Sequence, residues 1–322
     1  MATIRDIAKQ AGVSVGTASR AITGNCYVSP ETRRLVQSVA EQLGYTPREH
    51  ARPAGGTKTV GVLLPDITFP FYSAFLKYAE VELAQNGYKT VVCNALGIRD
   101  RVTEMLEYAE KRELDGLIVN ADVTEDEIRR LEKVPVVSFE RLLGPKIPMV
   151  ASDHRQGGQL AAEELLRCGC KNVLIITFRH QNPLFGDIRI GECKRILQEQ
   201  HVKVTVAEVG GPMLTYPLFK EIAAEYMRLY SGADAIFTDD VMAYCCVQEA
   251  KNRGIQIPEQ LRILGYDGNE ITKIVSPQIT TIEQNIAALT QCCIERLLLQ
   301  IHGEPGEAEK LLPVRLLKGG TT

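Results

Sequence analysis

Apolar runs and helical patterns alternate along most of the chain, and this alternation constrains the fold more than any other feature. Residues 60–66, VGVLLPD, form a continuous apolar run, as expected of a strand covered on both faces. A helical pattern follows over about 70–86, and the alternation continues to residues 262–267. Repeated strand–helix–strand units predict parallel sheets with helices on both faces. The predicted fold class of this region is therefore α/β and doubly wound.

The alternation falls into two series, which predict two similar lobes with a cleft between them. The first series ends near residue 140, and the second starts at about residue 153. Ligands of open parallel sheets bind beyond the carboxyl ends of the strands. Several predicted strands carry polar residues at that edge, namely Asp66, Asn94, Asp240 and Asp267.

The N-terminal segment follows a different pattern, that of three short helices. Residues 3–20, TIRDIAKQAGVSVGTASR, are typical of two amphipathic helices joined by a tight turn. Gly12 can end the first helix in the left-handed conformation, and Ser14 can cap the second. Ser29 and Pro30 are a good cap and a good first residue for a third helix.

The second of these helices has two distinct faces. Val15, Ala18 and Ile22 are expected to face inward. The outer face holds small and polar residues with one arginine, which suits a helix that enters the DNA major groove, about 12 Å wide. These residues are Gly16, Thr17, Ser19 and Arg20. An ordinary helical hairpin is the alternative interpretation.

The charge distribution favours contact between one end of the chain and a polyanion. Residues 1–58 hold eight Lys or Arg against four Asp or Glu, a formal charge of +4. Since the whole chain carries −3, about −7 remains for residues 59–322.

Composition and missing motifs argue against several other classes of protein. No run reaches the roughly 18 apolar residues of a membrane span, and no signal segment precedes the helices, which predicts a cytoplasmic protein without a membrane partner. The nine cysteines lack C-x-x-C spacing, which favours reduced thiols and no metal site. The sequence has no G-x-S-x-G, P-loop or G-x-G-x-x-G motif. We therefore predict no catalytic residues, no cofactor and no enzymatic activity.

Several motifs, taken in order, resemble the LacI/GalR family of bacterial transcription regulators over essentially the full length. The resemblance implies a helix-turn-helix headpiece, a hinge, and a two-lobed core similar to periplasmic binding proteins. It also implies a homodimer on a near-palindromic operator in double-stranded DNA and a small effector in the cleft. Within the family, the chain most resembles sucrose-operon-type repressors. The motifs are TIRDIAKQAGVSVGTASRAI, YVSPETRRLV, LGYTP, VGVLLPD, DGLIV, DHRQGGQLAAEEL, ADAIFTDDVMA, RILGYDG and ITTIEQ.

The expected domains follow from the patterns and the resemblance together. They are a DNA-binding headpiece over 1–46, a hinge over 47–58, and an effector-binding and dimerisation core over 59–322. The lobes of the core are expected over 59–152 plus 286–322, and over 153–285.

The resemblance also implies which headpiece residues contact DNA. Val15 and Gly16 match the base-reading pair, and Arg20 matches a base-contacting arginine. Thr17 and Ser19 would reach phosphates, although a capping or packing role for Thr17 is an alternative. The full predicted set is Thr3, Val15, Gly16, Thr17, Ser19, Arg20, Asn25, Arg52 and Ala54.

The hinge departs from the family pattern. Pro53 stands inside the expected hinge helix, where proline costs about 3 kcal/mol, and Ala54 replaces the leucine that wedges into the minor groove. One hypothesis is less DNA bending, a lower affinity for DNA or a modified dimer geometry. The other is that Arg52 still enters the minor groove while the segment stays extended.

The resemblance places six effector-binding residues in the cleft. They combine an aromatic pair, which can pack on a sugar ring, with groups that hold several hydroxyls. They are Phe71, Tyr72, Asp153, Arg189, Asp240 and Gln284. A core position for Phe71 and helix capping by Asp240 are the structural alternatives. His154 stands where relatives tend to have asparagine, and its role is open.

The sequence therefore predicts a DNA-binding transcriptional regulator, a repressor of a carbohydrate-utilisation operon released by a sugar or sugar phosphate. The alternative is a sugar-binding protein of the same core fold whose atypical hinge impairs DNA binding. Inducer and corepressor action both remain open.

Arg20→Ala is predicted to weaken operator binding by about 1–3 kcal/mol, the contribution of a bidentate arginine–guanine contact. Titration of labelled operator DNA with both proteins measures the difference. Equal operator affinities would remove Arg20 from the base-reading set.

Overall fold

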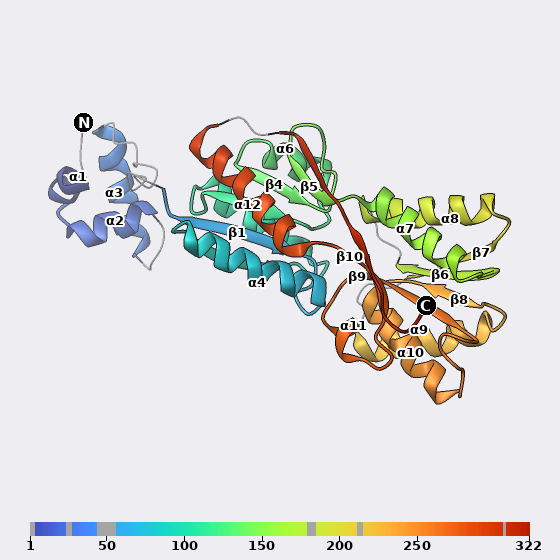
Figure 1. Cartoon of the computed structure of the whole chain (residues 1–322). Helices are drawn as coiled ribbons and strands as arrows, with labels where there is room; N and C mark the ends of the chain where they lie inside the picture. Colours follow the sequence, from blue (N-terminus) through green and yellow to red (C-terminus); the bar gives the residue numbers. More distant parts are fainter. Residues whose placement is uncertain (1–3, 24–27, 44–55, 179–184, 211–214, 305–306) are drawn as a thin grey trace. The chain divides into compact units, whose positions relative to one another are not determined.

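Figure 1 shows the computed structural model, which describes residues 4–23, 28–43, 56–178, 185–210, 215–304 and 307–322. It divides into two units, residues 1–55 and 56–322, and the division lies within the expected hinge segment. In the described part of the chain, no helix is long and apolar enough to cross a membrane.

The N-terminal unit contains three helices, α1 (Ile4–Gln10), α2 (Val15–Thr23) and α3 (Pro30–Gln42). The predicted turn and caps are confirmed. Gly12 has φ +64°, the Ser14 hydroxyl accepts from the Thr17 amide at 3.1 Å, and the Ser29 hydroxyl accepts from the Thr32 amide at 3.3 Å. The small core between the helices includes Ile7, Ala8, Ala11, Ala18, Ala21, Val36, Val39 and Ala40.

The inward position predicted for Val15 is wrong. Its side chain is 45% exposed, whereas Ala18 is fully buried. Val15 is the first residue of α2, so its side chain lies beyond the small core that Ala18 and Ala21 reach.

The first sheet of the core is parallel, with strand order β11-β5-β4-β3-β1-β2. Its strands are β1 (Thr59–Leu64), β2 (Lys89–Asn94), β3 (Gly116–Val119), β4 (Val136–Phe139), β5 (Met149–Ser152) and β11 (Glu309–Leu312). Its helices are α4 (Pro70–Gln85), α5 (Arg99–Glu110), α6 (Glu125–Leu131) and α12 (Ile286–His302). Side chains of α4 and α12 pack on one face, and those of α5 and α6 pack on the other.

The second sheet has the order β12-β10-β9-β8-β6-β7. Its strands are β6 (Asn172–Phe178), β7 (Lys203–Val209), β8 (Ala235–Phe237), β9 (Arg262–Asp267), β10 (Thr280–Glu283) and β12 (Arg315–Leu317). Its helices are α7 (His154–Arg167), α8 (Ile188–Glu199), α9 (Tyr216–Leu229), α10 (Asp240–Asn252) and the short α11 (Ile271–Ile274), with a 3-10 turn η1 at Phe185–Asp187. Helices α7 and α8 cover one face, and α9 and α10 cover the other.

The predicted doubly wound α/β class with a helix-turn-helix headpiece is confirmed. The expected assignment of all of residues 286–322 to the first lobe is wrong, because β12 pairs with β10 of the second sheet. This pairing is antiparallel, whereas the other strand pairs among the described residues are parallel. The chain therefore crosses between the sheets a third time, between β11 and β12.

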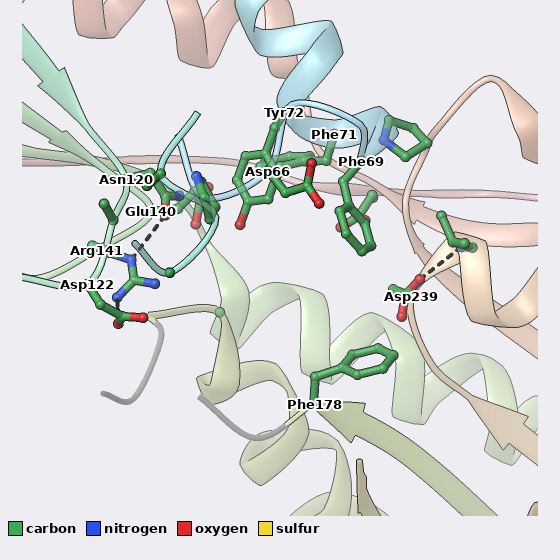
Figure 2. A pocket seen from close by; sticks show the side chains of 18 of the residues that line it. Asp66, Phe69, Phe71, Tyr72, Asn120, Asp122, Glu140, Arg141, Phe178 and Asp239 are labelled. Carbon is green, nitrogen blue, oxygen red and sulfur yellow. Dashed lines mark hydrogen bonds and ion pairs between the residues drawn. The ribbon is translucent and has the colours of Figure 1, made fainter. Parts of the chain in front are cut away.

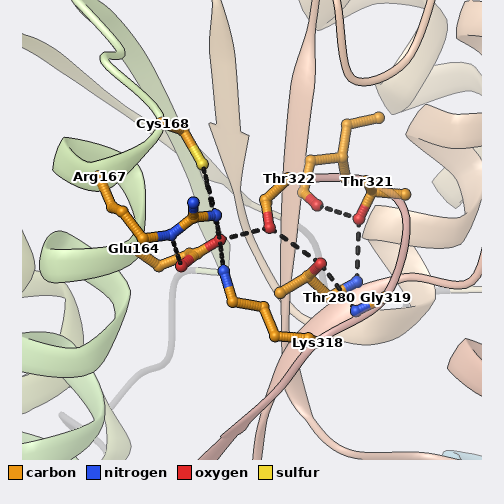
Figure 3. Close-up of polar contacts among 9 residues, drawn as sticks. Glu164, Arg167, Cys168, Thr280, Lys318, Gly319, Thr321 and Thr322 are labelled. Atoms are coloured by element: carbon orange, nitrogen blue, oxygen red, sulfur yellow. Dashed lines mark hydrogen bonds and ion pairs between the residues drawn. The ribbon is translucent and has the colours of Figure 1, made fainter.

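Glu164 of α7 anchors the C-terminal segment to the second sheet (Figure 3). Its side chain is buried, accepts hydrogen bonds from Arg167 at 2.9 and 3.0 Å and from the Thr322 hydroxyl at 2.6 Å, and pairs with Lys318. The Thr280 hydroxyl joins this cluster through Thr322 at 2.9 Å. Burial alone would raise the pKa of Glu164, but the hydrogen bonds from Arg167, Lys318 and Thr322 outweigh it and lower that pKa to about 2.

Glu164→Gln is expected to reduce the free energy of unfolding by about 1–3 kcal/mol at pH 7, because charge-assisted hydrogen bonds to a buried group are lost. A depressed carboxyl pKa stabilises the fold above about pH 4.5 and loses this effect as pH falls toward 2. Urea unfolding of both proteins at pH 7 and pH 3 should therefore show a smaller difference at pH 3. Glu163→Gln, at an exposed neighbouring position, is the matched control, and a difference that does not depend on pH would contradict the assignment.

Candidate functional site

The two sheets of the core enclose a cavity of about 380 Å³ at the carboxyl ends of their strands (Figure 2). Segments that follow β1, β2, β3 and β4 form one wall, and segments at the ends of β6, β7, β8 and β9 form the other. This is the edge at which open parallel sheets bind ligands, and the volume suits a small molecule.

Phe71 and Tyr72, predicted as the aromatic pair, both line the cavity from the start of α4. Phe71 stacks on Phe139 at 5.7 Å between ring centroids and also packs against the core, so the core and cavity interpretations hold together. Burial raises the pKa of Tyr72 to about 12, despite the opposing effect of Arg141, so its hydroxyl stays protonated near neutral pH.

A second aromatic group lines the cavity and joins the two lobes. Phe69 precedes α4, and its ring centroid lies 5.7 Å from that of Phe219 in α9. The ring centroid of Phe219 lies 5.2 Å from that of Phe178 at the end of β6. The Tyr216 hydroxyl donates to the carbonyl oxygen of Thr68 at 2.7 Å. The cavity thus has an apolar side built by both lobes.

Arg141 provides the opposite, polar side of the cavity (Figure 2). Its side chain is buried, and it donates to Asn120 Oδ1 at 3.0 Å and to Asp122 Oδ1 at 2.7 Å. Because a buried guanidinium is costly without partners, these two contacts offset the cost of its burial and hold it in place.

Arg189, the predicted pocket arginine, lines the cavity from the first turn of α8. Its guanidinium lies over the ring of Tyr266, 4.3 Å from the centroid, a cation–π contact. Gly186 makes room for it, since a Cβ at that position would lie 2.6 Å from Nη1 of Arg189.

The structure corrects the placement of Asp240. This side chain is fully buried and does not line the cavity, because it accepts from the Asn269 amide at 2.7 Å and the Thr281 hydroxyl at 2.6 Å. Its neighbour Asp239 lines the cavity instead. Strand β8 ends at Phe237, so Asp239 rather than Asp240 caps α10 and points its side chain the other way.

Asp153 also does not line the cavity. It is the N-cap of α7, where its side chain accepts from the Gln156 amide at 2.9 Å. Its carboxylate is thus engaged at the helix start, while the next residue, His154, faces the cavity.

His154 links the lobes through both of its ring nitrogens. It is 2% exposed, with Nε2 at 2.5 Å from Glu140 after β4 and Nδ1 at 2.9 Å from the hydroxyl of Tyr266 in β9. Glu140 also accepts from the Ser152 amide at 2.8 Å. The histidine therefore orders one carboxylate of the cavity wall and one aromatic ring under Arg189.

Gln284 and Asp267 form a second link across the crossovers, and both line the cavity. Gln284 Nε2 donates to Asp267 at 2.8 Å, and Gln284 Oε1 accepts from the Ser152 hydroxyl at 2.7 Å. Burial raises the pKa of Asp267 to about 7, with Arg189 opposing the rise and Asp239 adding to it.

The predicted DNA-contacting residues are only partly described. Val15 and Gly16 are exposed on α2, and the Thr17 hydroxyl hydrogen-bonds with the Ser14 hydroxyl at 2.8 Å, a local capping contact. Helix α2 includes Ser19 and Arg20, but their side chains lie outside the described part, as do Thr3, Asn25, Arg52, Pro53 and Ala54.

Comparisons with known proteins agree with this architecture. Residues 3–48 match the model of bacterial regulatory proteins of the lacI family, and residues 162–322 match a periplasmic binding protein-like domain. A sucrose operon repressor from Streptococcus mutans serotype c is 32% identical, and the match covers 99% of each chain. The chain belongs to the LacI family.

Solved structures of other LacI-family regulators share the fold of the core. One from Enterococcus faecium with bound ribose is 29% identical, with a TM-score of 0.73 over 82% of this chain and 98% of that chain. One from Alkaliphilus metalliredigens, complexed with D-xylulofuranose, is 27% identical, with a TM-score of 0.75 over 82% of this chain and 99% of that chain.

Of the six predicted effector residues in this LacI-family core, the cavity brings together Phe71, Tyr72, Arg189 and Gln284. Their effector contacts stay a prediction. The motif comparison did not identify several polar residues that line the cavity. The expectation that ligands bind beyond the carboxyl ends of strands does identify them, because they follow β3, β4 and β8. These are Asn120, Asp122, Glu140, Arg141 and Asp239.

Asp267→Asn is expected to stabilise the protein by about 1–4 kcal/mol at pH 8, because it removes a desolvated charge and keeps an acceptor for Gln284. Asparagine also tolerates the φ of +114° at this position. A carboxyl pKa raised from 3.8 to about 7 makes stability fall as pH rises between those values.

The advantage of the variant should therefore shrink as pH falls toward 4. Urea unfolding of both proteins between pH 4 and pH 8 measures it. A variant that is less stable than the parent at pH 8 would show that the carboxylate is favourably paired.

Proposed function

We propose that this LacI-family protein represses a carbohydrate-utilisation operon and that a sugar bound in the core cavity regulates it. The observation that carries the proposal is the full-length similarity to a sucrose operon repressor. The cavity supports it, because it combines aromatic rings with carboxylate, amide and guanidinium groups, the set that binds a polyol.

The headpiece supplies the DNA contacts of the proposal. In this proposal Val15 and Gly16, which are exposed on α2, meet base edges, and Arg20 makes the principal base contact. Thr17 and Ser19 would contact phosphates, which set the register of the helix on the duplex. We propose that the protein binds a near-palindromic operator as a homodimer, as the family resemblance implies.

Regulation requires the effector to distinguish two arrangements of the molecule. A ligand that binds both equally shifts nothing, so the sugar must bind the arrangement that does not bind DNA more tightly if it is an inducer. The cavity is built by both lobes and by the crossovers between them, so its shape depends on how the lobes are arranged.

A sugar-binding protein with impaired DNA binding is the second candidate, favoured by Pro53 and Ala54 in the hinge sequence. Enzymatic turnover has less support, since the curated relatives are repressors. Hydrolysis of a sugar by the purified protein would contradict both proposals.

Binding to a DNA fragment from upstream of the gene, measured by fluorescence anisotropy across salt concentrations, tests the repressor. We expect a steep loss of affinity with salt, and weaker binding when sucrose or its phosphate is added. Folded dimer that binds no fragment under any condition would favour the second candidate and indicate that the hinge uncouples headpiece from core.

A further inference from the structure

Carboxyl groups outnumber guanidinium groups in the lining of the cavity. Among its described lining residues, five are carboxylates, whereas three are guanidinium groups. The carboxylates are Asp66, Asp122, Glu140, Asp239 and Asp267. This balance bears on whether the proposed sugar effector is phosphorylated.

Two of the three guanidinium groups already have carboxylate partners. Arg99 pairs with Glu127 at 3.0 Å, and buried Arg141 pairs with Asp122 at 2.7 Å. The third, Arg189, lines the cavity together with Asp239 and Asp267, and its charge opposes the rise that burial causes in the pKa of each. Arg141 and Arg189 therefore offset carboxylates of the cavity, and Arg99 is paired with a carboxylate outside it, which leaves little positive charge for a bound anion.

Asp239 presents an acceptor that lacks a donor. Its Oδ1 accepts from the amides of Val241 and Met242 at 2.9 and 3.0 Å, which caps α10. Its Oδ2 is buried and has no hydrogen-bond partner among the described residues. Since buried acceptors are normally satisfied, this oxygen indicates a ligand that donates a hydrogen bond.

We propose that the cavity binds a neutral, unphosphorylated sugar whose hydroxyls donate to Asp239 and Asp267 and whose apolar face packs against Phe69 and Phe178. The proposal rests on the sugar-binding function inferred above and narrows its ligand. Figure 2 shows Phe69, Phe178 and Asp239 around the same part of the cavity.

A phosphate ester fits this site poorly for two reasons. Its ionised oxygens only accept hydrogen bonds, so a phosphate group that lies beside Asp239 cannot satisfy Oδ2. Its negative charge would also lie among carboxylates in a partly desolvated space, where like charges repel strongly. A cationic amino group beside Asp239 and Asp267 would meet the guanidinium of Arg189, which lines the same wall and already supplies their countercharge.

Isothermal titration calorimetry of the full chain tests the proposal with matched pairs. The probes are sucrose, D-fructose and D-ribose, each compared with sucrose 6-phosphate, D-fructose 6-phosphate or D-ribose 5-phosphate, and D-glucosamine as the cation. We expect at least one neutral sugar to bind. Its phosphate ester should bind about tenfold more weakly, or weaker still.

Two variants connect this selectivity to Asp239. Asp239→Asn and Asp239→Ser both keep a residue that caps helices well and remove the Oδ2 carboxylate oxygen. Each variant should bind the neutral sugar about tenfold more weakly. The difference in affinity between the sugar and its phosphate ester should also become smaller. Asp126→Asn removes one exposed charge outside the cavity. This control should change neither the affinity for the neutral sugar nor the difference in affinity between the sugar and its ester.

Tighter binding of a phosphate ester or of D-glucosamine would overturn the proposal, as would unchanged sugar affinity in both folded Asp239 variants. Binding of none of the neutral sugars would overturn it as well. Operator binding is measured separately on the same preparation. Its loss would refute the repressor function, whereas its retention without sugar binding would refute only the ligand assignment.

Discussion

Buried hydrogen bonds at the crossovers hold the two sheets of the core in one arrangement, and the cavity depends on them. His154 ties Glu140 of the first sheet to Tyr266 of the second, and Gln284 ties Ser152 to Asp267. Each of these groups would be costly to bury alone, so the network favours the arrangement that satisfies all of them. The same side chains form part of the cavity wall, which couples ligand contacts to the arrangement of the lobes.

The cavity concentrates charge that the fold itself does not need. Asp267 is half-buried although desolvation raises its pKa, and Asp239 keeps an oxygen without a partner among the described residues. Such groups reduce stability in the unliganded protein, and this cost is typical of binding sites. The contrast with Glu164 is instructive, because that carboxylate is fully partnered and its pKa falls.

Most elements of the core could be predicted from periodicity alone. The strand predicted over 60–66 and the helix predicted over about 70–86 occur within two residues of their expected ends, since long apolar runs and amphipathic helices are strong local signals. Strands β11 and β12 were not predicted, because short edge strands such as EKLL and RLL carry little pattern of their own. Their sheet membership depends on partners far away in the sequence.

The sequence by itself determined the α/β class, the headpiece helices with their caps, and the family, because these follow from local periodicity, capping chemistry and ordered motifs. Tertiary structure decided which of two adjacent aspartates faces the cavity. Asp239 and Asp240 are the same residue type at adjacent positions. The positions at which β8 ends and α10 begins determine that Asp239 lines the cavity and that Asp240 is buried. It also decided the role of His154, whose partners Glu140 and Tyr266 are 14 and 112 residues away and meet only when the two sheets pack.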